Sequence, residues 1–282
     1  MRRTLILWLA AGLVYGKAPK RIVSTAPSIT ELIYALGLGD RVVGVDRFSR
    51  YPADALKKPK IGDYSNPNLE TIASLRPDLV IIPTNPVKLA DRLTTLRLKV
   101  LEIDQESIAK LYASFRIVGQ ATGAVPEAAK LTATVRDQLE AVRARAAPLK
   151  KTRMMFVVGR TPNRLDGLIV VGQASYLNEI IALAGGENVF RDAVASYPTV
   201  SLEEVLARNP DVIIDMGDMA DTVGVTAEHK REVTSLWERL ASVSAVKQRR
   251  VHAVASDVYV VPGPRVVDAA KAFFEMLHPE AR

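Results

Sequence analysis

Hydrophobic and polar positions alternate in two series along the chain, and each series consists of short apolar runs separated by amphipathic stretches. From residue 20 onward, "RIVST", "RVVGV", "DLVIIP" and "KVLEI" alternate with segments such as "SITELIYALGL" and "NLETIASLR". A second series begins at "RMMFVVG" and continues through "DVIIDMG" and "RVHAVAS" to "GPRVVDAAKAFFEML". This alternation is typical of largely parallel sheets connected by helices. We therefore predict an α/β fold of two Rossmann-like lobes, each with a central parallel sheet.

One stretch of sequence is present in both series. "SNPNLETIASLRPDLVII" (65–82) returns as "PTVSLEEVLARNPDVII" (198–214), with the Leu-Glu and Pro-Asp pairs at the same spacing in both. Each copy predicts a polar turn, a short helix and a buried strand. The repeat indicates that the two lobes are equivalent, and it places Glu70 and Glu203 at the same position in a first helical turn.

A long amphipathic segment separates the two series. Between Pro126 and Ala147, apolar residues recur at spacings of three and four, and no glycine interrupts the pattern. A helix of this length would extend for about 33 Å, enough to contact both lobes. We expect a signal segment at 1–18, a first lobe at 19–124, an interlobe helix at 125–149 and a second lobe at 150–282.

The N-terminus predicts export. "MRRTLILWLAAGLVYG" places two arginines before an apolar run, as in secretory signal peptides, and the run is shorter than the about 20 residues that span a bilayer. The chain has no cysteine, which excludes disulfides, thiolate metal sites and a lipid-bearing cysteine. We predict a periplasmic monomer with a cleavable signal peptide and no lipid anchor.

Composition and motifs argue against nucleic-acid binding and catalysis. The net charge of +7 is spread along the chain, without the basic stripe of a nucleic-acid surface. The three histidines have no partner at metal-ligand spacing, and "GLGDR" follows a helix where a dinucleotide motif would follow a strand. We expect no enzymatic activity, no cofactor and no metal site. An exported α/β enzyme remains the alternative.

The carboxyl ends of the predicted strands carry candidate binding residues, because open α/β sheets bind ligands there. Most are aromatic or uncharged and polar, which favours a large, partly apolar ligand between the lobes. Packing in the core is the alternative for each aromatic residue alone. The candidates are Pro27, Ser28, Phe48, Tyr64, Thr84 and Asn85 in the first lobe, and Arg160, Tyr197, Asp257 and Tyr259 in the second.

From about residue 20 to the C-terminus, the chain resembles the class III solute-binding proteins of ABC importers, which serve cobalamin, ferric siderophore and haem uptake. The resemblance rests on "RIVSTAPSITELIYALGLGDRVVGV", "YPADALKKPKIGDYSNPNLETIASLRPDLVI", "GGENVF" and "YPTVSLEEVLARNPDVII". It implies two lobes joined by a helix, with the ligand in the cleft between them. The chain is most similar to the cobalamin-binding branch, which implies that Phe48, Tyr64 and Tyr197 contact a corrinoid and that Asp257 and Tyr259 lie in the second contact loop.

Several positions depart from that branch. Tyr64 and Tyr197 stand where tryptophans are more typical, and Pro83, Val260 and Val261 replace aromatic or polar residues. Haem is an alternative ligand, because haem-binding relatives often carry a tyrosine ligand in the loop of Tyr64. A ferric siderophore is another, and it would recruit arginines such as Arg160 or Arg265.

The resemblance also implies a role for the repeated glutamates. In the family, one acid from each lobe docks onto arginines of the permease dimer in the inner membrane, and Glu70 and Glu203 match those positions. Helix electrostatics is a compatible explanation, since an acid in a first turn stabilises a helix by about 0.3 to 1 kcal/mol. Glu204 takes the capping-box position after Ser201, which leaves Glu203 available for a partner.

Overall fold

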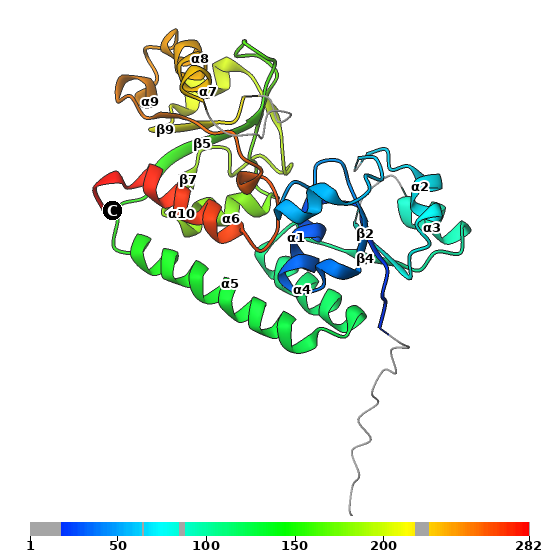
Figure 1. Cartoon of the computed structure of the whole chain (residues 1–282). Coiled ribbons are helices and arrows are strands. Elements are labelled where there is room, and N and C mark those ends of the chain that lie inside the picture. The colour runs from blue at the N-terminus through cyan, green and yellow to red at the C-terminus, as the bar shows by residue number, and fades with distance from the viewer. Residues whose placement is uncertain (1–17, 64, 85–87, 218–225, 282) are drawn as a thin grey trace, which may run out of the picture.

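The computed structural model describes residues 18–63, 65–84, 88–217 and 226–281. The described residues form two α/β lobes that lie side by side, with one long helix below both (Figure 1). Most of the predicted signal segment, residues 1–17, lies outside the described part. In the part that is described, no helix has both the length and the apolar composition needed to cross a membrane.

The first lobe contains a four-stranded sheet in the order β2-β1-β3-β4, and all of its strand pairs are parallel. β1 and β3 are almost completely buried, which explains their unbroken apolar sequences. The strands are β1 (Ile22–Ser24), β2 (Val42–Val45), β3 (Leu79–Pro83) and β4 (Val100–Ile103), and the helices are α1 (Pro27–Ala35), η1 (Gly39–Arg41), η2 (Ala53–Lys57), α2 (Leu69–Ser74), α3 (Leu89–Thr95) and α4 (Ile108–Thr122).

The second lobe contains a six-stranded sheet in the order β10-β9-β5-β6-β8, with β7 also paired to β5. The strands are β5 (Thr152–Gly159), β6 (Leu168–Val170), β7 (Gly186–Asn188), β8 (Thr199–Val200), β9 (Val212–Asp215) and β10 (Val251–Ala253). The helices are α6 (Tyr176–Leu183), α7 (Leu202–Arg208), α8 (Ala227–Glu238), α9 (Ser244–Lys247), η3 (Asp257–Tyr259), α10 (Val266–Leu277) and η4 (Pro279–Ala281).

This second sheet is mixed, whereas the alternation of the sequence predicts a largely parallel sheet. β10, β9, β5 and β7 are parallel, but β6 runs antiparallel to both β5 and β8. The reason is the connection between β5 and β6. It consists of residues 160–167 and ends at Gly167 with φ of 58°, and it is too short for the helical crossover that a parallel pair requires.

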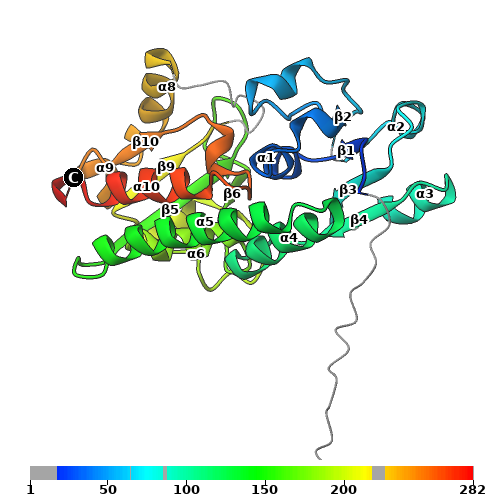
Figure 2. The ribbon, with the colours of Figure 1, turned by 60° about the horizontal axis from the view of Figure 1, so that its bottom comes forward.

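Helix α5 (Val125–Ala146) connects the lobes. It packs against α4 of the first lobe and against α6 and α10 of the second (Figures 1 and 2). The predicted apolar stripe is the buried face of the helix, and Ala128, Val135, Leu139 and Val142 are all buried. The same hydrophobic cluster includes residues of both lobes, so α5 and the lobes share one continuous core.

The repeated sequence forms α2 with β3 in one lobe and α7 with β9 in the other. Each copy ends its helix with a residue in the left-handed region, Arg76 at φ of 47° and Asn209 at φ of 42°. An arginine near the first strand of each lobe donates a hydrogen bond to the carbonyl of that residue. Arg21 contacts Arg76 and Arg153 contacts Asn209, each at 3.2 Å. The two lobes therefore share the structure of the helix C-terminus, with its left-handed residue and its arginine hydrogen bond, as well as the repeated sequence.

Candidate ligand-binding site

A cavity of about 600 Å³ lies between the two lobes, beside the carboxyl ends of several strands. This is the position at which open α/β sheets bind ligands. The first lobe contributes residues 26–28, 83–84 and 103–106, and the second contributes residues 158, 169, 174–176, 196–197 and 260–262.

Four of the ten predicted ligand-binding residues line this cavity: Pro27, Ser28, Thr84 and Tyr197. Pro27 begins α1 directly after β1, a position that suits proline because the first helical turn needs no N–H donor there. The backbone N–H of Thr84 donates to the carbonyl of Ile103 at 2.8 Å, which holds the end of β3 beside the end of β4. These four residues are brought together from both lobes.

Ser28 takes part in a hydrogen-bonded chain that crosses between the lobes. Its hydroxyl donates to Oε1 of Gln105 at 2.8 Å, and Nε2 of Gln105 donates to the carbonyl of Pro262 at 2.9 Å. Ser28 and Gln105 are both buried. All three residues line the cavity, so this chain fixes part of the cavity wall at the contact between the lobes.

Two further predicted residues, Phe48 and Asp257, do not line the cavity. Phe48 is 40% exposed, and the guanidinium of Arg47 lies 4.6 Å from its ring centroid. Asp257 accepts an ion pair from Nη2 of Arg265 at 3.1 Å. Phe48 is therefore open to solvent, while Asp257 is already engaged within the protein.

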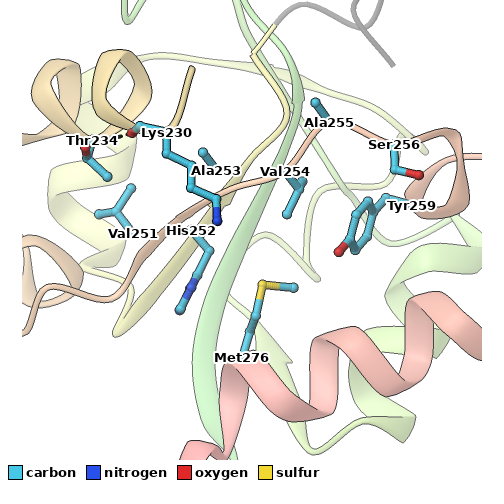
Figure 3. Close-up of a pocket in the computed structure, with 10 residues that line it drawn as sticks. All are labelled: Lys230, Thr234, Val251, His252, Ala253, Val254, Ala255, Ser256, Tyr259 and Met276. Carbon is cyan, nitrogen blue, oxygen red and sulfur yellow. Dashed lines mark hydrogen bonds between the residues drawn. The ribbon is translucent and has the colours of Figure 1, made fainter. Parts of the chain in front are cut away.

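Arg160 and Tyr259 do not line the cavity and contact residues of the second lobe instead. Nε of Arg160 lies 3.0 Å from Oδ2 of Asp215, and the side chains of this pair are 4% and 0% exposed. Tyr259 packs edge-on against Phe156 at 6.4 Å between ring centroids. Its side chain turns toward Met276 in a different cavity, beside β10 and α10 (Figure 3).

The remaining two predicted residues, Tyr64 and Asn85, lie outside the described residues. The undescribed internal segments, residue 64 and residues 85–87 and 218–225, contain no lysine, arginine or histidine in their sequence.

The sequence reasoning missed the polar residues that directly follow β4. Asp104, Gln105 and Glu106 line the cavity, and Lys110 forms ion pairs with Asp104 at 2.7 Å and with Glu106 at 3.8 Å. Burial is the largest single effect and raises the pKa of Asp104, but the hydrogen bonds from Lys110 and from the backbone N–H of Glu106, together with the charge of Lys110, outweigh it. The pKa of Asp104 therefore lies below its ordinary value. The rule that identified Thr84, a polar residue at the carboxyl end of a strand, would also have found these three.

Two more missed residues come from the start of α6. Ser175 is the N-cap of this helix, and its hydroxyl accepts from the backbone N–H of Leu177 at 3.2 Å. The same hydroxyl lies 3.1 Å from the hydroxyl of Tyr197. Tyr176, the first residue of the helix, lines the cavity and is 4% exposed. The N-cap serine before an apolar helix is the sequence signal that marks this turn.

The charged residues around the cavity give it a negative character. Among the described residues that line it, the charged ones are Asp104 and Glu106, and none is Arg, Lys or His. A second cluster at the interlobe contact pairs Arg265 with two carboxylates, Glu31 and Asp257. Asp104 and Glu106 likewise share one cation, Lys110, so each of the two clusters has two carboxylates for one cation.

The structure also places the two repeated glutamates. Glu70 and Glu203 are exposed and lie in the first turns of α2 and α7. The pKa of Glu203 lies below its ordinary value, because the carboxylate accepts hydrogen bonds from the backbone N–H of Glu203 and from the Ser201 hydroxyl. Glu204 completes a capping box with Ser201, in agreement with the sequence.

Among the described residues, no group of three or more His, Asp or Glu could hold a metal ion.

Comparison with known proteins identifies the family. Residues 22–258 match the model of the periplasmic binding protein family, over most of the chain. The chain belongs to this family. The uncharacterised ABC transporter substrate-binding lipoprotein YvrC of Bacillus subtilis is 31% identical over 94% of this chain and 82% of its own length.

Solved structures of periplasmic binding proteins share the fold. The vitamin B12 binding protein BtuF of Vibrio cholerae is 28% identical, with a TM-score of 0.79 over 94% of this chain and 98% of its own. The apo haem-binding protein RhuT of Roseiflexus sp. RS-1 is also 28% identical, with a TM-score of 0.78 over 93% of this chain and 99% of its own.

Membership in this family determines the broad function. The protein is a periplasmic binding protein of the ABC importer type, whose members bind substrates and are not enzymes. Its partner is an ABC importer permease, and it works in the periplasm or outside the cell.

Proposed function

We propose that this periplasmic binding protein captures a corrinoid, a vitamin B12-like molecule, in the interlobe cavity and delivers it to the permease of an ABC importer. Similarity of fold alone does not select the ligand, because the TM-scores to a vitamin B12 binding protein and to a haem-binding protein are 0.79 and 0.78. The choice therefore depends on the chemistry of the cavity wall.

The observation that supports a corrinoid is the charge of the cavity. Haem carries two propionates and ferric siderophores are commonly anionic, so both would need cations from the protein. The described lining instead includes the carboxylates of Asp104 and Glu106, which share the single cation of Lys110, and none of the described lining residues is itself cationic. Two like charges 4 Å apart repel by about 1 kcal/mol in water and by about 4 kcal/mol near a protein surface. A corrinoid bears uncharged amide side chains, which avoid this repulsion.

The shape and polarity of the wall also suit a corrinoid. Tyr176 and Tyr197 provide aromatic surface, and Pro27, Pro83 and Val158 provide apolar surface for the face of a large ring. Carboxylate oxygens can accept hydrogen bonds from the amide N–H groups of the ligand. We place ligand contacts at Pro27, Ser28, Thr84 and Tyr197, and we keep the other predicted residues as candidates at the rim or in the second lobe.

Docking to the permease is the second part of the proposal. Glu70 and Glu203 occupy equivalent exposed positions on the two lobes, and Figure 1 shows that α2 and α7 both lie away from α5. A permease dimer presents the same basic surface twice, and a monomeric binding protein with two equivalent lobes matches it with two equivalent acids. We further propose that residues 1–18 are a cleavable signal peptide for export to the periplasm.

The test is a comparison of ligands on the exported, purified protein. Cyanocobalamin, hemin and a ferric siderophore are titrated, with calorimetry and visible absorbance as readouts. We expect cyanocobalamin to bind with one-to-one stoichiometry and the two anionic ligands to bind at least about tenfold more weakly. A hemin complex with a phenolate-type spectrum and no binding of cyanocobalamin would contradict the proposal.

A charge variant sharpens this test. Glu106→Arg places a cation in the cavity wall, and we expect the affinity for hemin to rise about five- to tenfold relative to that for cyanocobalamin. Glu127→Arg is the matched control, because Glu127 is an exposed acid on α5, away from the cavity. An equal change in both variants would show that the net charge of the protein, and not the cavity, controls the preference.

A further inference from the structure

The hydroxyl of Tyr176 is buried and has no hydrogen-bond partner among the described residues. The residue is 4% exposed and lines the interlobe cavity. It begins α6, a helix that packs against α5 and α10 in the continuous core. The lack of a partner therefore occurs at a firmly packed position in the wall of the cavity.

Burial of a hydroxyl without a partner costs about 1 to 3 kcal/mol, so buried polar groups are nearly always hydrogen-bonded. The neighbouring polar groups of the cavity wall already have partners within the protein. The hydroxyl of Tyr197 pairs with Ser175, and the amide of Gln105 pairs with Ser28 and Pro262. A molecule that enters the cavity can therefore supply the partner that Tyr176 lacks within the protein.

We infer that Tyr176 is a ligand-binding residue whose hydroxyl donates a hydrogen bond to an uncharged acceptor on the bound molecule, such as the carbonyl oxygen of a side-chain amide. This inference rests on the proposed corrinoid function and adds a specific contact to it. Side-chain rotations at binding surfaces are common when a ligand arrives, so a hydroxyl that is enclosed in the free protein can turn toward the ligand.

The surroundings of the hydroxyl favour a donor over a metal ligand. Burial raises the pKa of Tyr176 well above 10, and the charges of Tyr197 and Glu31 raise it further. The phenol therefore stays protonated and can act as a hydrogen-bond donor, whereas coordination of a ferric ion would require the deprotonated phenolate. An amide carbonyl fits this donor, and a carboxylate would again meet the negative charge of Asp104 and Glu106.

The test is Tyr176→Phe, which removes the hydroxyl and keeps the ring. We expect the affinity for cyanocobalamin to fall about tenfold, as the loss of one buried hydrogen bond predicts. We also expect the ligand-free variant to be at least as stable as the wild type in urea, because an unpaired buried hydroxyl has been removed. Tyr34→Phe is the matched control. The hydroxyl of Tyr34 is also buried without a partner among the described residues, but Tyr34 does not line the cavity.

Three outcomes separate this inference from the proposed function. Equal cyanocobalamin affinity in Tyr176→Phe and the wild type would overturn the inference alone. If the wild type binds hemin instead, the corrinoid proposal fails, and Tyr176→Phe is titrated with hemin. The side-chain acceptors of hemin are carboxylates, so an unchanged absorbance spectrum with about tenfold weaker binding would keep Tyr176 as a hydrogen-bond donor to the ligand and overturn the uncharged acceptor. Loss of a phenolate charge-transfer band would overturn the donor role itself. Binding of none of the three ligands would overturn both.

Discussion

Arg265 donates hydrogen bonds to the carboxylate of Glu31 through both Nε and Nη2, across the contact between the two lobes. Glu31 belongs to α1 of the first lobe, and Arg265 directly precedes α10 of the second. The same guanidinium pairs with Asp257 at 3.1 Å and lies 4.1 Å from the ring centroid of Tyr51. The Arg265 side chain thus connects Glu31 and Tyr51 of the first lobe with Asp257 of the second. These contacts fix the relative position of the lobes beside the cavity.

Removal of this guanidinium should destabilise the protein strongly. Arg265→Ala leaves Glu31, which is 3% exposed, without its partner, and loss of one member of a buried ion pair costs about 3 to 5 kcal/mol. Urea unfolding followed by circular dichroism measures the change. Arg143→Ala is the control, because Arg143 pairs with Glu140 on the surface of α5 and exposed pairs contribute about 0 to 1 kcal/mol. Similar losses in the two variants would contradict the assignment.

The same cluster predicts a dependence of stability on pH. Burial raises the pKa of Glu31 above its ordinary value of 4.5, and the charges of Asp257 and Asp268 add to this, although Arg265 acts in the opposite direction. The folded protein therefore binds this proton more tightly than the unfolded chain does. The contribution of Glu31 to stability is fully present below pH 4.5 and is lost as the pH rises through the raised pKa.

Glu31→Gln tests this sign, because glutamine does not ionise. The pKa of Arg265 is also raised, so the guanidinium stays charged throughout the relevant range and adds no pH dependence there. We expect the unfolding free energy of the wild type, relative to that of the variant, to decrease as the pH rises above 4.5. A relative stability that is constant or increases over this range would show that the ion pair with Arg265 outweighs the effect of burial.

The apolar pattern of the sequence predicted most of the fold because burial determines it. Strands covered on both faces have continuous apolar sequences, and the single stripe of α5 is the face that packs against both lobes. The antiparallel pairing of β6 with β5 was not predicted, because a strand of three residues has no periodicity that reveals its direction.

The candidate site was harder to predict because side-chain direction and long-range pairing are not local properties. Tyr259 and Tyr197 are both tyrosines near strand ends, yet one packs in the core and the other faces the cavity. Arg265 and Glu31 are separated by 234 positions, and the sequence alone offered no reason to pair them. Asp104 and Glu106 could have been found, since they follow β4 as Thr84 follows β3.

Tyr197 should contribute binding energy through its ring. It is 43% exposed in the cavity wall, and a ligand that covers the ring buries aromatic surface. We expect Tyr197→Ala to weaken cyanocobalamin binding about tenfold, a loss typical of aromatic contacts at interfaces, while Tyr197→Phe stays within about threefold. Calorimetry on Phe48→Ala, carried out alongside these variants, shows whether the ligand extends as far as Phe48, because only then does the affinity fall. Unchanged affinity in Tyr197→Ala would place the ligand elsewhere.

The two repeated glutamates should be needed for transport and not for ligand capture. Glu70 and Glu203 are exposed in the first turns of equivalent helices, so a change to lysine leaves both cores intact and reverses the charge that a basic permease surface would meet. We expect the double variant Glu70→Lys, Glu203→Lys to lose permease-dependent uptake of labelled cobalamin in cells, with ligand affinity within a few-fold of the wild type.

A control with the same chemistry separates docking from general effects of charge. Glu127 is also an exposed acid in a first helical turn, but it belongs to α5, away from α2 and α7. Glu127→Lys should therefore transport normally. Single variants at Glu70 and Glu203 should each reduce uptake partially, because the remaining lobe still presents its acid. Normal uptake by the double variant would exclude these glutamates from docking, and equal loss in Glu127→Lys would attribute the effect to net charge.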